Sequence, residues 1–474
     1  MASENRQLQI FFLPAMGQGH MIPMVDLARL FASRGVKATI VTTPVNATLI
    51  SKSIQRTNVN ILTFKFPSAE AGLPEGCENV ETTPPHLLAN LILASLKLRK
   101  PVDQIIRDHH PDCLVADYFY SWATEVAGTY NIPRIVFNAT NFFTLCVSAS
   151  IRKYQPFKNI SSRSEPCLIP DLPDVMHMTM EQLPNWKADG ESDMAKLSQA
   201  AKVSASKSYG DIINSFYELE PAYVDHYRNV LGKKAWHVGP LCLATRDMEE
   251  KVHRGKQAAI GEHEYLKWLD SKKTSSVIYV CFGSVAKFND AQLREIGLAL
   301  EASGYPFIWV VRRSPKKSEE QEEWLPGGFE ERTEGRGLII RGWAPQVSIL
   351  EHQAIGAFMN HSGWNSVLES ITAGVPMVTW PMVADNFVIE KLVTEILKIG
   401  VSVGVKRLDG IKGDSIKSEA IEKALNKIMA GEEAEEMRKR GKTLAELSKR
   451  AVEEGSSYVQ LDAFIEEIAL YRQR

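Results

Sequence analysis

The residues most suggestive of chemistry form a short run, His361-Ser362-Gly363-Trp364-Asn365-Ser366, which follows an apolar stretch. We expect that stretch, residues 355–360, to be a buried strand, and we expect a helix to begin at about Trp364. The first N–H groups of a helix have no partner within the helix, so a strand, a glycine turn and a helix start together form an anion site. A diphosphate fits such a site, although Asn365 and Ser366 can equally serve as helix caps.

A carboxylate follows on the same expected helix. Glu369 lies four residues after Asn365, one turn further along the same face. A carboxylate in that place can accept hydrogen bonds from two ribose hydroxyls. The alternative is an ordinary charge in the first turns of a helix.

A second pair of candidate residues lies in the first half of the chain. His20 ends the run Gly17-Gln18-Gly19-His20, between an expected strand at residues 7–15 and an expected helix that begins near Ile22. Asp117 lies in the expected strand at residues 113–118. Carboxyl ends of parallel strands meet at one edge of a sheet, so His20 and Asp117 can form a hydrogen bond there. His20 would then be a general base that Asp117 orients, unless it is a neutral residue that packs at the helix start.

The hydrophobic pattern supplies parallel strands to carry both groups. Apolar and β-branched runs alternate with segments of helical period in each half of the chain. Further strands are expected at residues 36–43, 59–66, 132–138, 276–283, 307–312, 337–342 and 375–380, and helices at 21–34, 85–107, 121–130, 290–302 and 364–373. The fold class is therefore α/β, with two facing doubly wound, Rossmann-like parallel sheets.

The pattern also predicts the domain boundaries. Residues 241–261 mix Gly, Pro and charges, which is typical of a linker. We expect a first domain over residues 1–240 and a second over residues 262–455. The amphipathic helix at about residues 456–474 is expected to pack back on the first domain.

Composition excludes several classes of protein. A chain of 474 residues with 44% hydrophobic residues and a net charge of -2 is typical of a soluble protein of two domains and gives no sign of nucleic-acid binding. No stretch approaches the ~20 apolar residues of a membrane span, and the apolar run at residues 10–15 is too short for a signal peptide. The six cysteines form no CxxC pair. We expect a cytoplasmic monomer with reduced thiols.

A longer block, from Trp343-Ala344-Pro345-Gln346 through His361 to Asp385 and Asn386, resembles the donor-binding box of plant family 1 UDP-glycosyltransferases. The PAMGQGH stretch at the N-terminus, the GPL stretch before the linker and the CFGS run after it extend the resemblance over essentially the whole chain. It implies a GT-B type fold and an inverting glycosyltransferase of plant secondary metabolism. UDP-sugar and a lipophilic small molecule would be the two ligands.

The resemblance also implies three groups of donor contacts. The uracil and ribose would be held by Trp343, Ala344, Gln346 and Glu369. The diphosphate would be held by Ser284, His361, Gly363, Asn365 and Ser366, and the sugar by Trp364, Asp385 and Asn386. Without the resemblance, Trp343 would be read as core packing and Ser284 as an ordinary loop serine.

Asn386 departs from the family's pattern. The box usually ends in Gln for glucosyl transfer, or in His in several galactosyl and pentosyl transferases. Asn keeps the amide but is shorter by about 1.5 Å, so its hydrogen bond to the sugar would change. UDP-glucose remains the expected donor, with UDP-galactose, a UDP-pentose and UDP-glucuronic acid as rivals.

In the implied reaction, His20 removes the acceptor's proton while the oxygen displaces UDP and inverts the anomeric carbon. The sequence has no Asp-x-Asp motif. The helix start at Trp364 would instead meet the charge of UDP, so we expect neither a metal nor another cofactor. Met16, Phe119, Asn138 and Phe142 follow or flank expected strand ends and could line an apolar pocket for a triterpenoid, steroid or flavonoid.

Two other functions are compatible with parts of the sequence. An NAD-dependent oxidoreductase would explain the GxG run, but the third glycine of the dinucleotide fingerprint is missing and the strand at residues 36–43 ends without an acidic residue. A non-catalytic nucleotide-sugar-binding protein would bind UDP without turnover. The expected pairing of His20 with Asp117 argues against it.

Overall fold

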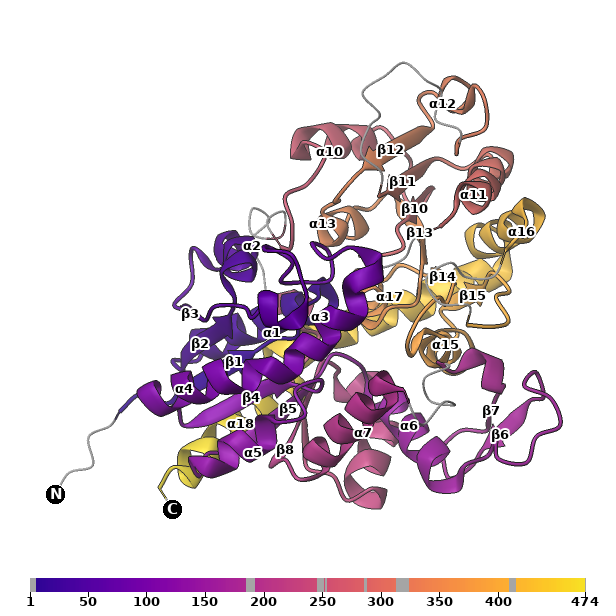
Figure 1. The fold of residues 1–474 in the computed structure, drawn as a ribbon. Helices are drawn as coiled ribbons and strands as arrows, with labels where there is room; N and C mark the ends of the chain where they lie inside the picture. The colour runs from indigo at the N-terminus through magenta and orange to yellow at the C-terminus, as the bar shows by residue number, and fades with distance from the viewer. Residues whose placement is uncertain are drawn as a thin grey trace. The chain divides into compact units, whose positions relative to one another are not determined.

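The structure is a computed structural model that describes residues 6–184, 192–244, 251, 254–284, 288–312, 324–408 and 415–473. The chain forms two compact units (Figure 1). One comprises Met1–Phe142, Trp186–Arg246 and Arg450–Arg474, and the other comprises Phe143–Asn185 and Asp247–Lys449.

The first unit is built on a seven-stranded sheet in the order β3-β2-β1-β4-β5-β8-β9. All neighbouring strands are parallel. The central strands are buried on both faces, as parallel sheets covered by helices require. The strand order reverses between β1 and β4, the switch point of a doubly wound sheet. The strands are β1 (Gln9–Leu13), β2 (Lys37–Thr42), β3 (Asn60–Thr63), β4 (Cys113–Asp117), β5 (Arg134–Asn138), β8 (Gly210–Ile213) and β9 (Ala235–His237).

Helix α18 (Ser456–Tyr471) completes one side of this sheet, although it lies far away in the sequence (Figure 1). Its Leu461, Phe464 and Ile468 belong to the core cluster that covers β1, β2, β4 and β5. The ring of Phe464 meets that of Trp236 edge to face, with the centroids 4.9 Å apart. The other helices of the unit are α1 (Gln18–Ser33), α2 (Pro44–Ile54), α3 (Leu88–Ala94), α4 (Arg99–His109), α5 (Ala123–Thr129), α7 (Asp193–Ser206) and α8 (Pro221–Asp225).

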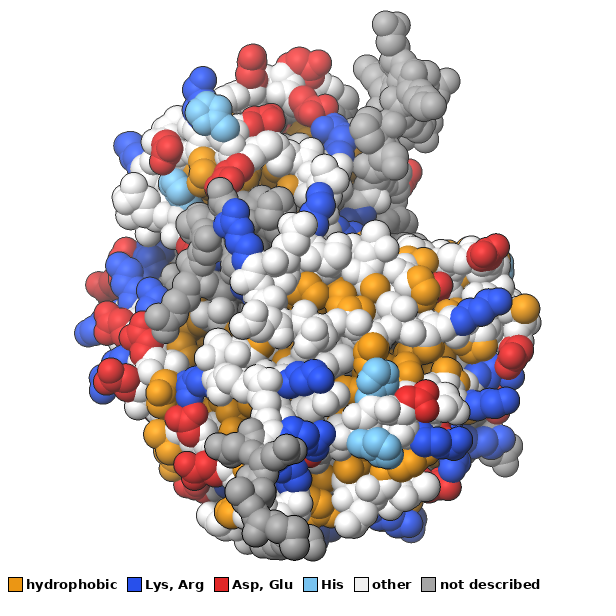
Figure 2. Space-filling view, turned by 90° about the vertical axis from the view of Figure 1, so that its left-hand side faces the viewer, with side chains coloured by type: hydrophobic (Ala, Val, Ile, Leu, Met, Phe, Trp, Pro, Cys, Tyr) orange, Lys and Arg blue, Asp and Glu red, His pale blue; other side chains and the backbone are white. Residues whose placement is uncertain are grey.

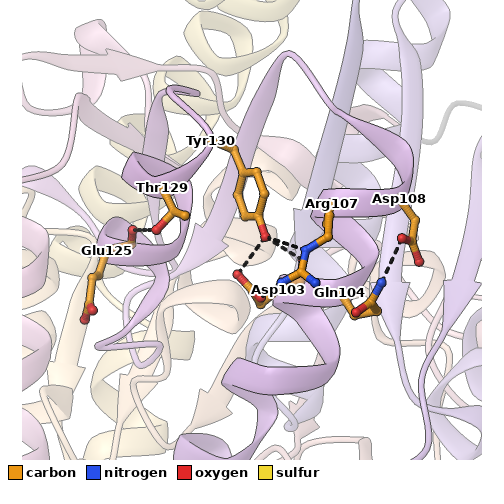
Figure 3. A network of polar contacts seen from close by, with 7 residues as sticks. All are labelled: Asp103, Gln104, Arg107, Asp108, Glu125, Thr129 and Tyr130. Carbon is orange, nitrogen blue, oxygen red and sulfur yellow. Dashed lines mark hydrogen bonds and ion pairs between the residues drawn. The ribbon is translucent and has the colours of Figure 1, made fainter.

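A surface network links α4 to α5 (Figure 3). The Tyr130 hydroxyl donates to Asp103 Oδ1 at 3.0 Å and accepts from Arg107 Nε at 3.3 Å. Arg107 also pairs with Asp103 at 3.0 Å. Arg107 is exposed, and Asp103 and Tyr130 are half-buried. Ion pairs at the surface contribute about 0–1 kcal/mol each. The network therefore orients two helices and carries no sign of a site.

The second unit contains a six-stranded parallel sheet in the order β12-β11-β10-β13-β14-β15. Its switch point lies between β10 and β13. The strands are β10 (Val277–Val280), β11 (Phe307–Val311), β12 (Gly337–Arg341), β13 (Ile355–Asn360), β14 (Met377–Thr379) and β15 (Gly400–Ser402). An antiparallel pair, β6 (Cys167–Ile169) and β7 (Met176–Met178), also belongs to this unit.

Helices surround the second sheet. Those that begin in the second unit are α10 (Glu262–Asp270), α11 (Asp290–Ser303), α12 (Phe329–Arg332), α13 (Gln346–Leu350), α14 (Trp364–Ala373), α15 (Asn386–Lys391), α16 (Ser418–Met429) and α17 (Glu432–Glu453). Helix α6 (Phe142–Tyr154) starts at the last residue of the first unit's opening segment.

The predicted α/β class with two doubly wound parallel sheets is confirmed. One helix boundary was wrong: α1 begins at Gln18 rather than near Ile22. Gly17 is the extended N-cap, and its carbonyl accepts from the N–H groups of His20 and Met21. The predicted helix at residues 85–107 is divided into α3 and α4 by a 3-10 turn.

The boundaries of the two compact units differ from the predicted domain boundaries. Residues 143–185 belong to the second unit, whereas the prediction put them in the first domain. The units place Arg450–Arg474 with the first sheet. Part of the predicted linker, residues 245–250 and 252–253, lies outside the described residues. The domain boundaries themselves stay a prediction.

The surface and the thiols are ordinary. On the face drawn in Figure 2, acidic and basic side chains are interspersed, in keeping with a net charge of -2. All six cysteines are described, and all are free thiols. Among the described helices, none combines the length and the apolar character needed to cross a membrane.

Candidate functional site

His20 and Asp117 meet at the switch point of the first sheet. Leu13 of β1 is paired with Ala116 of β4, so the segments that follow both strands leave the sheet side by side. His20, in the first turn of α1, places Nδ1 2.8 Å from Asp117 Oδ2. Asp117 is fully buried, whereas the His20 side chain is 34% exposed.

The second oxygen of Asp117 is also used. Oδ1 accepts from the N–H of Phe119 at 3.1 Å. The carboxylate is therefore fixed by the backbone on one side and by the imidazole on the other. With Nδ1 bound to Asp117, Nε2 is the nitrogen of His20 that can take up a proton.

The four predicted acceptor residues fall into two groups. Phe119 is 40% exposed, and its ring lies edge-on to His20 at 5.3 Å between centroids. Met16 is half-buried beside the same strand ends and packs against the core on that side of the sheet. Both residues therefore lie close to the histidine or to the segment that carries it.

Asn138 and Phe142 are instead part of the core. Asn138 is buried, and its Nδ2 donates to Asp211 Oδ1 at 2.8 Å. Burial raises the pKa of Asp211 to about 6, and this carboxyl also accepts from the Tyr227 hydroxyl at 3.2 Å. Phe142 is fully buried against Tyr227, with ring centroids 5.5 Å apart. The role of Asn138 and Phe142 in an acceptor pocket stays a prediction.

His361 lies at the switch point of the second sheet, between two glycines. A Cβ atom added to Gly283, which follows β10 with φ of 71°, would lie 2.5 Å from the ring. A Cβ atom added to Gly363 would lie 2.4 Å from it. Any larger residue at either position would displace the imidazole.

His361 is neutral at neutral pH. Burial first, and the positive charge of Arg312 second, lower its pKa to about 4. Its Nδ1 is buried and has no hydrogen-bond partner among the described residues. A neutral imidazole can donate one hydrogen bond to an anion without a change of protonation.

The turn after β13 directs the start of α14 toward the same place. Ser362 adopts a left-handed conformation, with φ of 61°, and its N–H donates to Asn360 Oδ1 at 2.8 Å. Gly363 is the N-cap and, within the part of the chain described, no side chain caps the helix from there. The capping interpretation of Asn365 and Ser366 is thereby weakened, because Gly363 occupies the cap position.

Of the residues assigned to uracil and ribose, Gln346 contacts Glu369. Gln346 Nε2 donates to Glu369 Oε2 at 2.7 Å and to Ser366 Oγ at 3.0 Å. The buried indole N–H of Trp343 has no partner among the described residues. The Ala344 side chain is buried directly after it. The structure thus joins Gln346 to Glu369 and leaves the Trp343 indole N–H without a partner among the described residues.

The side-chain amide of Asn386 forms its hydrogen bonds with backbone groups. It is 3% exposed, and its Oδ1 accepts from the N–H groups of Met382 and Val383 at 3.3 and 3.0 Å. Its Nδ2 donates to the Ser362 carbonyl at 3.3 Å. The amide therefore joins the turn before α14 to the loop that carries Asp385, the N-cap of α15.

Sequence reasoning missed two arginines near these residues. Arg312 follows β11, and its guanidinium contacts the Ser284 carbonyl, which places a cation beside His361. Its place at the carboxyl end of a strand was a usable signal. Arg254 forms an ion pair with Glu369. It lies in the predicted linker, where nothing in the sequence marked it.

The described residues contain no cluster of three or more His, Cys, Asp or Glu side chains that could hold a metal ion. The geometry thus presents a histidine–carboxylate pair in the first unit and, in the second, the start of α14 next to the buried, neutral His361.

Comparison with known proteins identifies the family. A family model described as UDP-glucoronosyl and UDP-glucosyl transferase matches residues 112–438. The chain is 51% identical over 473 residues to scopoletin glucosyltransferase of Nicotiana tabacum, covering 98% of both chains. It is 51% identical over 482 residues to UDP-glucose flavonoid 3-O-glucosyltransferase 7 of Fragaria ananassa, covering 99% of this chain and 98% of that one.

A solved structure gives the same result. UGT73P12 of Glycyrrhiza uralensis, complexed with glycyrrhetinic acid 3-O-monoglucuronide, has a TM-score of 0.92 and 40% identity over 99% of this chain and 97% of that chain. The predicted GT-B type fold is confirmed. The chain therefore belongs to the UDP-glucoronosyl and UDP-glucosyl transferase family and is a UDP-dependent glycosyltransferase.

Proposed function

We propose that this glycosyltransferase uses His20 as a general base to transfer a sugar, with inversion, from a UDP-sugar to a hydroxyl of a lipophilic small molecule. The observation that carries the proposal is the 2.8 Å contact between His20 Nδ1 and the fully buried Asp117. A buried carboxylate holds the imidazole in the tautomer whose Nε2 accepts a proton. The base and acceptor belong to the domain predicted over residues 1–240, and the donor to residues 262–455.

The reaction has one displacement. As His20 Nε2 takes the proton of the acceptor hydroxyl, the oxygen forms a bond to the anomeric carbon from the side opposite UDP. The bond from that carbon to the diphosphate oxygen breaks, and UDP leaves with the electron pair. Asp117 stabilises the imidazolium that has formed. An α-linked donor thereby gives a β-glycoside.

The charge that develops on UDP needs stabilisation. The N–H groups at the start of α14, the neutral imidazole of His361 and the cation of Arg312 provide it together. We propose that these groups serve in place of a metal ion, and that the enzyme needs no cofactor. Activity that survives EDTA supports this, and activity lost with EDTA and restored by Mg²⁺ or Mn²⁺ contradicts it.

We propose UDP-glucose as the donor and a polycyclic phenol or a triterpenoid alcohol as the acceptor. Two similar enzymes act on scopoletin and on a flavonoid, and the structure similar to this one holds a triterpenoid glucuronide. The half-buried Met16 and the exposed Phe119 beside His20 suit such apolar acceptors. We also propose that the enzyme is a cytoplasmic monomer.

The test is a matrix of purified enzyme, four UDP-sugars (glucose, galactose, xylose and glucuronic acid) and acceptors of three classes, analysed by mass spectrometry. Coumarin, flavonoid and triterpenoid hydroxyls represent the classes. A β-glucoside of at least one acceptor is the expected product, with its anomeric configuration read from the proton coupling in NMR. An α-glycoside would refute the single displacement, and UDP binding without any product would favour a non-catalytic protein.

A further inference from the structure

Glu369 and Arg254 form a buried ion pair in the second unit. The two side chains are 7% and 9% exposed, and Arg254 Nη1 contacts Glu369 Oε1. The other oxygen, Oε2, accepts from Gln346 Nε2 at 2.7 Å. Both carboxylate oxygens of the residue assigned to the ribose thus have a protein partner already.

These contacts leave room for a ligand. An ionised carboxylate has about four acceptor sites, two on each oxygen. Among the described residues, Arg254 and Gln346 use one on each oxygen, which leaves one site on Oε1 and another on Oε2. Two neighbouring hydroxyls of a ribose require that pair of acceptors.

We propose that Arg254 is a positioning residue for the nucleoside of the donor: it holds the Glu369 carboxylate in the orientation in which its remaining acceptor sites receive the two ribose hydroxyls. The inference rests on the proposed function, because it assumes that UDP-sugar binds at Glu369. Arg254 acts through Glu369.

Two physical reasons support this role. A buried carboxylate without a cationic partner is costly, and it turns toward water. A carboxylate displaced in this way offers fewer acceptors to the ribose. In addition, Arg254 neutralises the charge of Glu369, which would otherwise repel the diphosphate of the same ligand.

The segment that carries Arg254 is held on the second unit at two further points. Lys251 pairs with Glu351 at 2.7 Å, and the Ala259 N–H donates to the Trp343 carbonyl at 2.8 Å. Trp343 is the residue assigned to the uracil. The segment therefore contacts Glu369, the residue assigned to the ribose, through Arg254, and Trp343, the residue assigned to the uracil, through Ala259.

The experiment compares the affinities of UDP and of 2′,3′-dideoxy-UDP by isothermal calorimetry on the full-length enzyme. The dideoxy compound lacks the two hydroxyls that would reach Glu369. Wild-type enzyme is expected to bind UDP at least about tenfold more tightly, since hydrogen bonds to a charged group are strong. In Arg254→Met, that ratio is expected to fall to about threefold or less.

Two variants separate this role from a general structural one. Lys251→Met breaks the other ion pair of the same segment and is expected to keep the wild-type ratio. Arg254→Lys keeps the positive charge but lacks the planar set of guanidinium N–H donors. Its ratio of UDP affinity to dideoxy-UDP affinity is expected to lie between those of Arg254→Met and wild type, and this variant can be measured even if Arg254→Met folds poorly.

The outcomes are distinct. A ratio that stays at the wild-type value, or rises, in both Arg254→Met and Arg254→Lys overturns the inference and leaves the proposed function intact. Equal falls in Arg254→Met and Lys251→Met also overturn it, because the segment as a whole would then be responsible. Wild-type enzyme that binds no UDP overturns the proposed function, and this inference with it.

Discussion

The switch points of the two sheets share a topology but present different groups. Between β1 and β4, the chain places two titratable side chains in contact, His20 and Asp117, with the histidine partly exposed. Between β10 and β13, it places glycines around one neutral histidine, His361, next to an uncapped helix start. The first arrangement suits proton transfer, and the second suits the binding of an anion without proton transfer.

The difference shows how one sheet order can serve two tasks. Carboxyl ends of strands next to a switch point leave a gap where a ligand can approach the backbone. A histidine oriented by a carboxylate supplies a proton acceptor in that gap. At the other switch point, glycines allow a ligand to approach the backbone closely, and burial and Arg312 keep the histidine neutral. That gap therefore suits an anion that accepts hydrogen bonds. The comparison predicts that mutations at the two places have separable effects on catalysis and on UDP affinity.

The largest expected effect is on turnover. His20→Ala removes the proposed base, so kcat should fall by about 10²–10⁴-fold, while UDP affinity stays within about threefold. Asp117→Asn should lower kcat by a similar factor through the wrong tautomer. Both are measured by product formation under saturating UDP-glucose, with calorimetry for UDP.

A matched control is His263→Ala, an exposed histidine on α10, which should leave kcat unchanged. Near-normal turnover in His20→Ala would remove the base from the mechanism. A parallel collapse of UDP affinity would contradict the separation between the two switch points.

The next effect is on donor binding. Gly363→Ala would bring a methyl group against His361, and overpacking of this kind costs about 1–3 kcal/mol. UDP affinity should fall by about tenfold or more, as measured by calorimetry. Gly261→Ala is the control, since a Cβ atom there meets nothing within 4 Å. Unchanged affinity in Gly363→Ala would mean that the ring of His361 does not contact the diphosphate.

A smaller effect concerns donor choice. Asn386→Gln adds a methylene, so the amide moves past its backbone partners and becomes available to the sugar. The preference for UDP-glucose over UDP-galactose should then rise by about threefold. The same change should lower Tm, because three hydrogen bonds of the loop are lost. Competition assays with both donors measure the ratio.

Asn386→Ala serves as the control for that variant. It loses the same hydrogen bonds and should lower Tm, but it offers no amide to the sugar. Should the two variants shift the donor ratio equally, loosening of the loop would explain the shift and the amide would have no part in it.

The smallest effect is on stability and depends on pH. Glu390 is buried, accepts from Thr379 Oγ1 at 2.6 Å, and burial raises its pKa to about 7. The folded protein therefore holds a proton that the unfolded chain releases near its ordinary pKa, and stability is lost as pH rises toward 7. Glu390→Gln cannot ionise. The Tm of this variant minus the Tm of wild type should therefore increase by about 2–4 °C from pH 5 to pH 8.

Differential scanning fluorimetry at both pH values checks this prediction. Glu419→Gln, an exposed glutamate on α16, is the control and should give the same Tm difference at pH 5 and pH 8. An equal difference in Glu390→Gln at the two pH values would show that the carboxyl is ionised in the folded protein throughout.

Much of the fold could be predicted because long strands and helices carry strong periodic patterns. The predicted strand at residues 355–360 and the helix from Trp364 coincide with β13 and α14. The short strands β8 and β9 were not predicted, because a polar residue interrupts the apolar run of each, Asp211 in β8 and His237 in β9. β8 even contains a buried charge, Asp211, whose partners Asn138 and Tyr227 are known only from the fold.

The candidate site was predictable where residues follow strands and less so elsewhere. His20 and Asp117 could be paired because both lie at strand ends that the doubly wound order brings together. Arg254 could not be assigned, since its partner Glu369 is more than 100 positions away and no pattern joins them. Asn138 was placed in an acceptor pocket from its strand-end position alone, whereas its amide turns toward the neighbouring strand.

Helix α18 has a consequence for biosynthesis. Leu461, Phe464 and Ile468 belong to the same cluster as Phe31 and Trp236, and the ring of Phe464 meets both of their rings edge to face. While a ribosome is still making residues 250–450, the emerging first sheet lacks this cover and exposes an aromatic face to solvent. We expect nascent chains at that stage to need a holding chaperone, and release from it to coincide with the synthesis of residues 456–471.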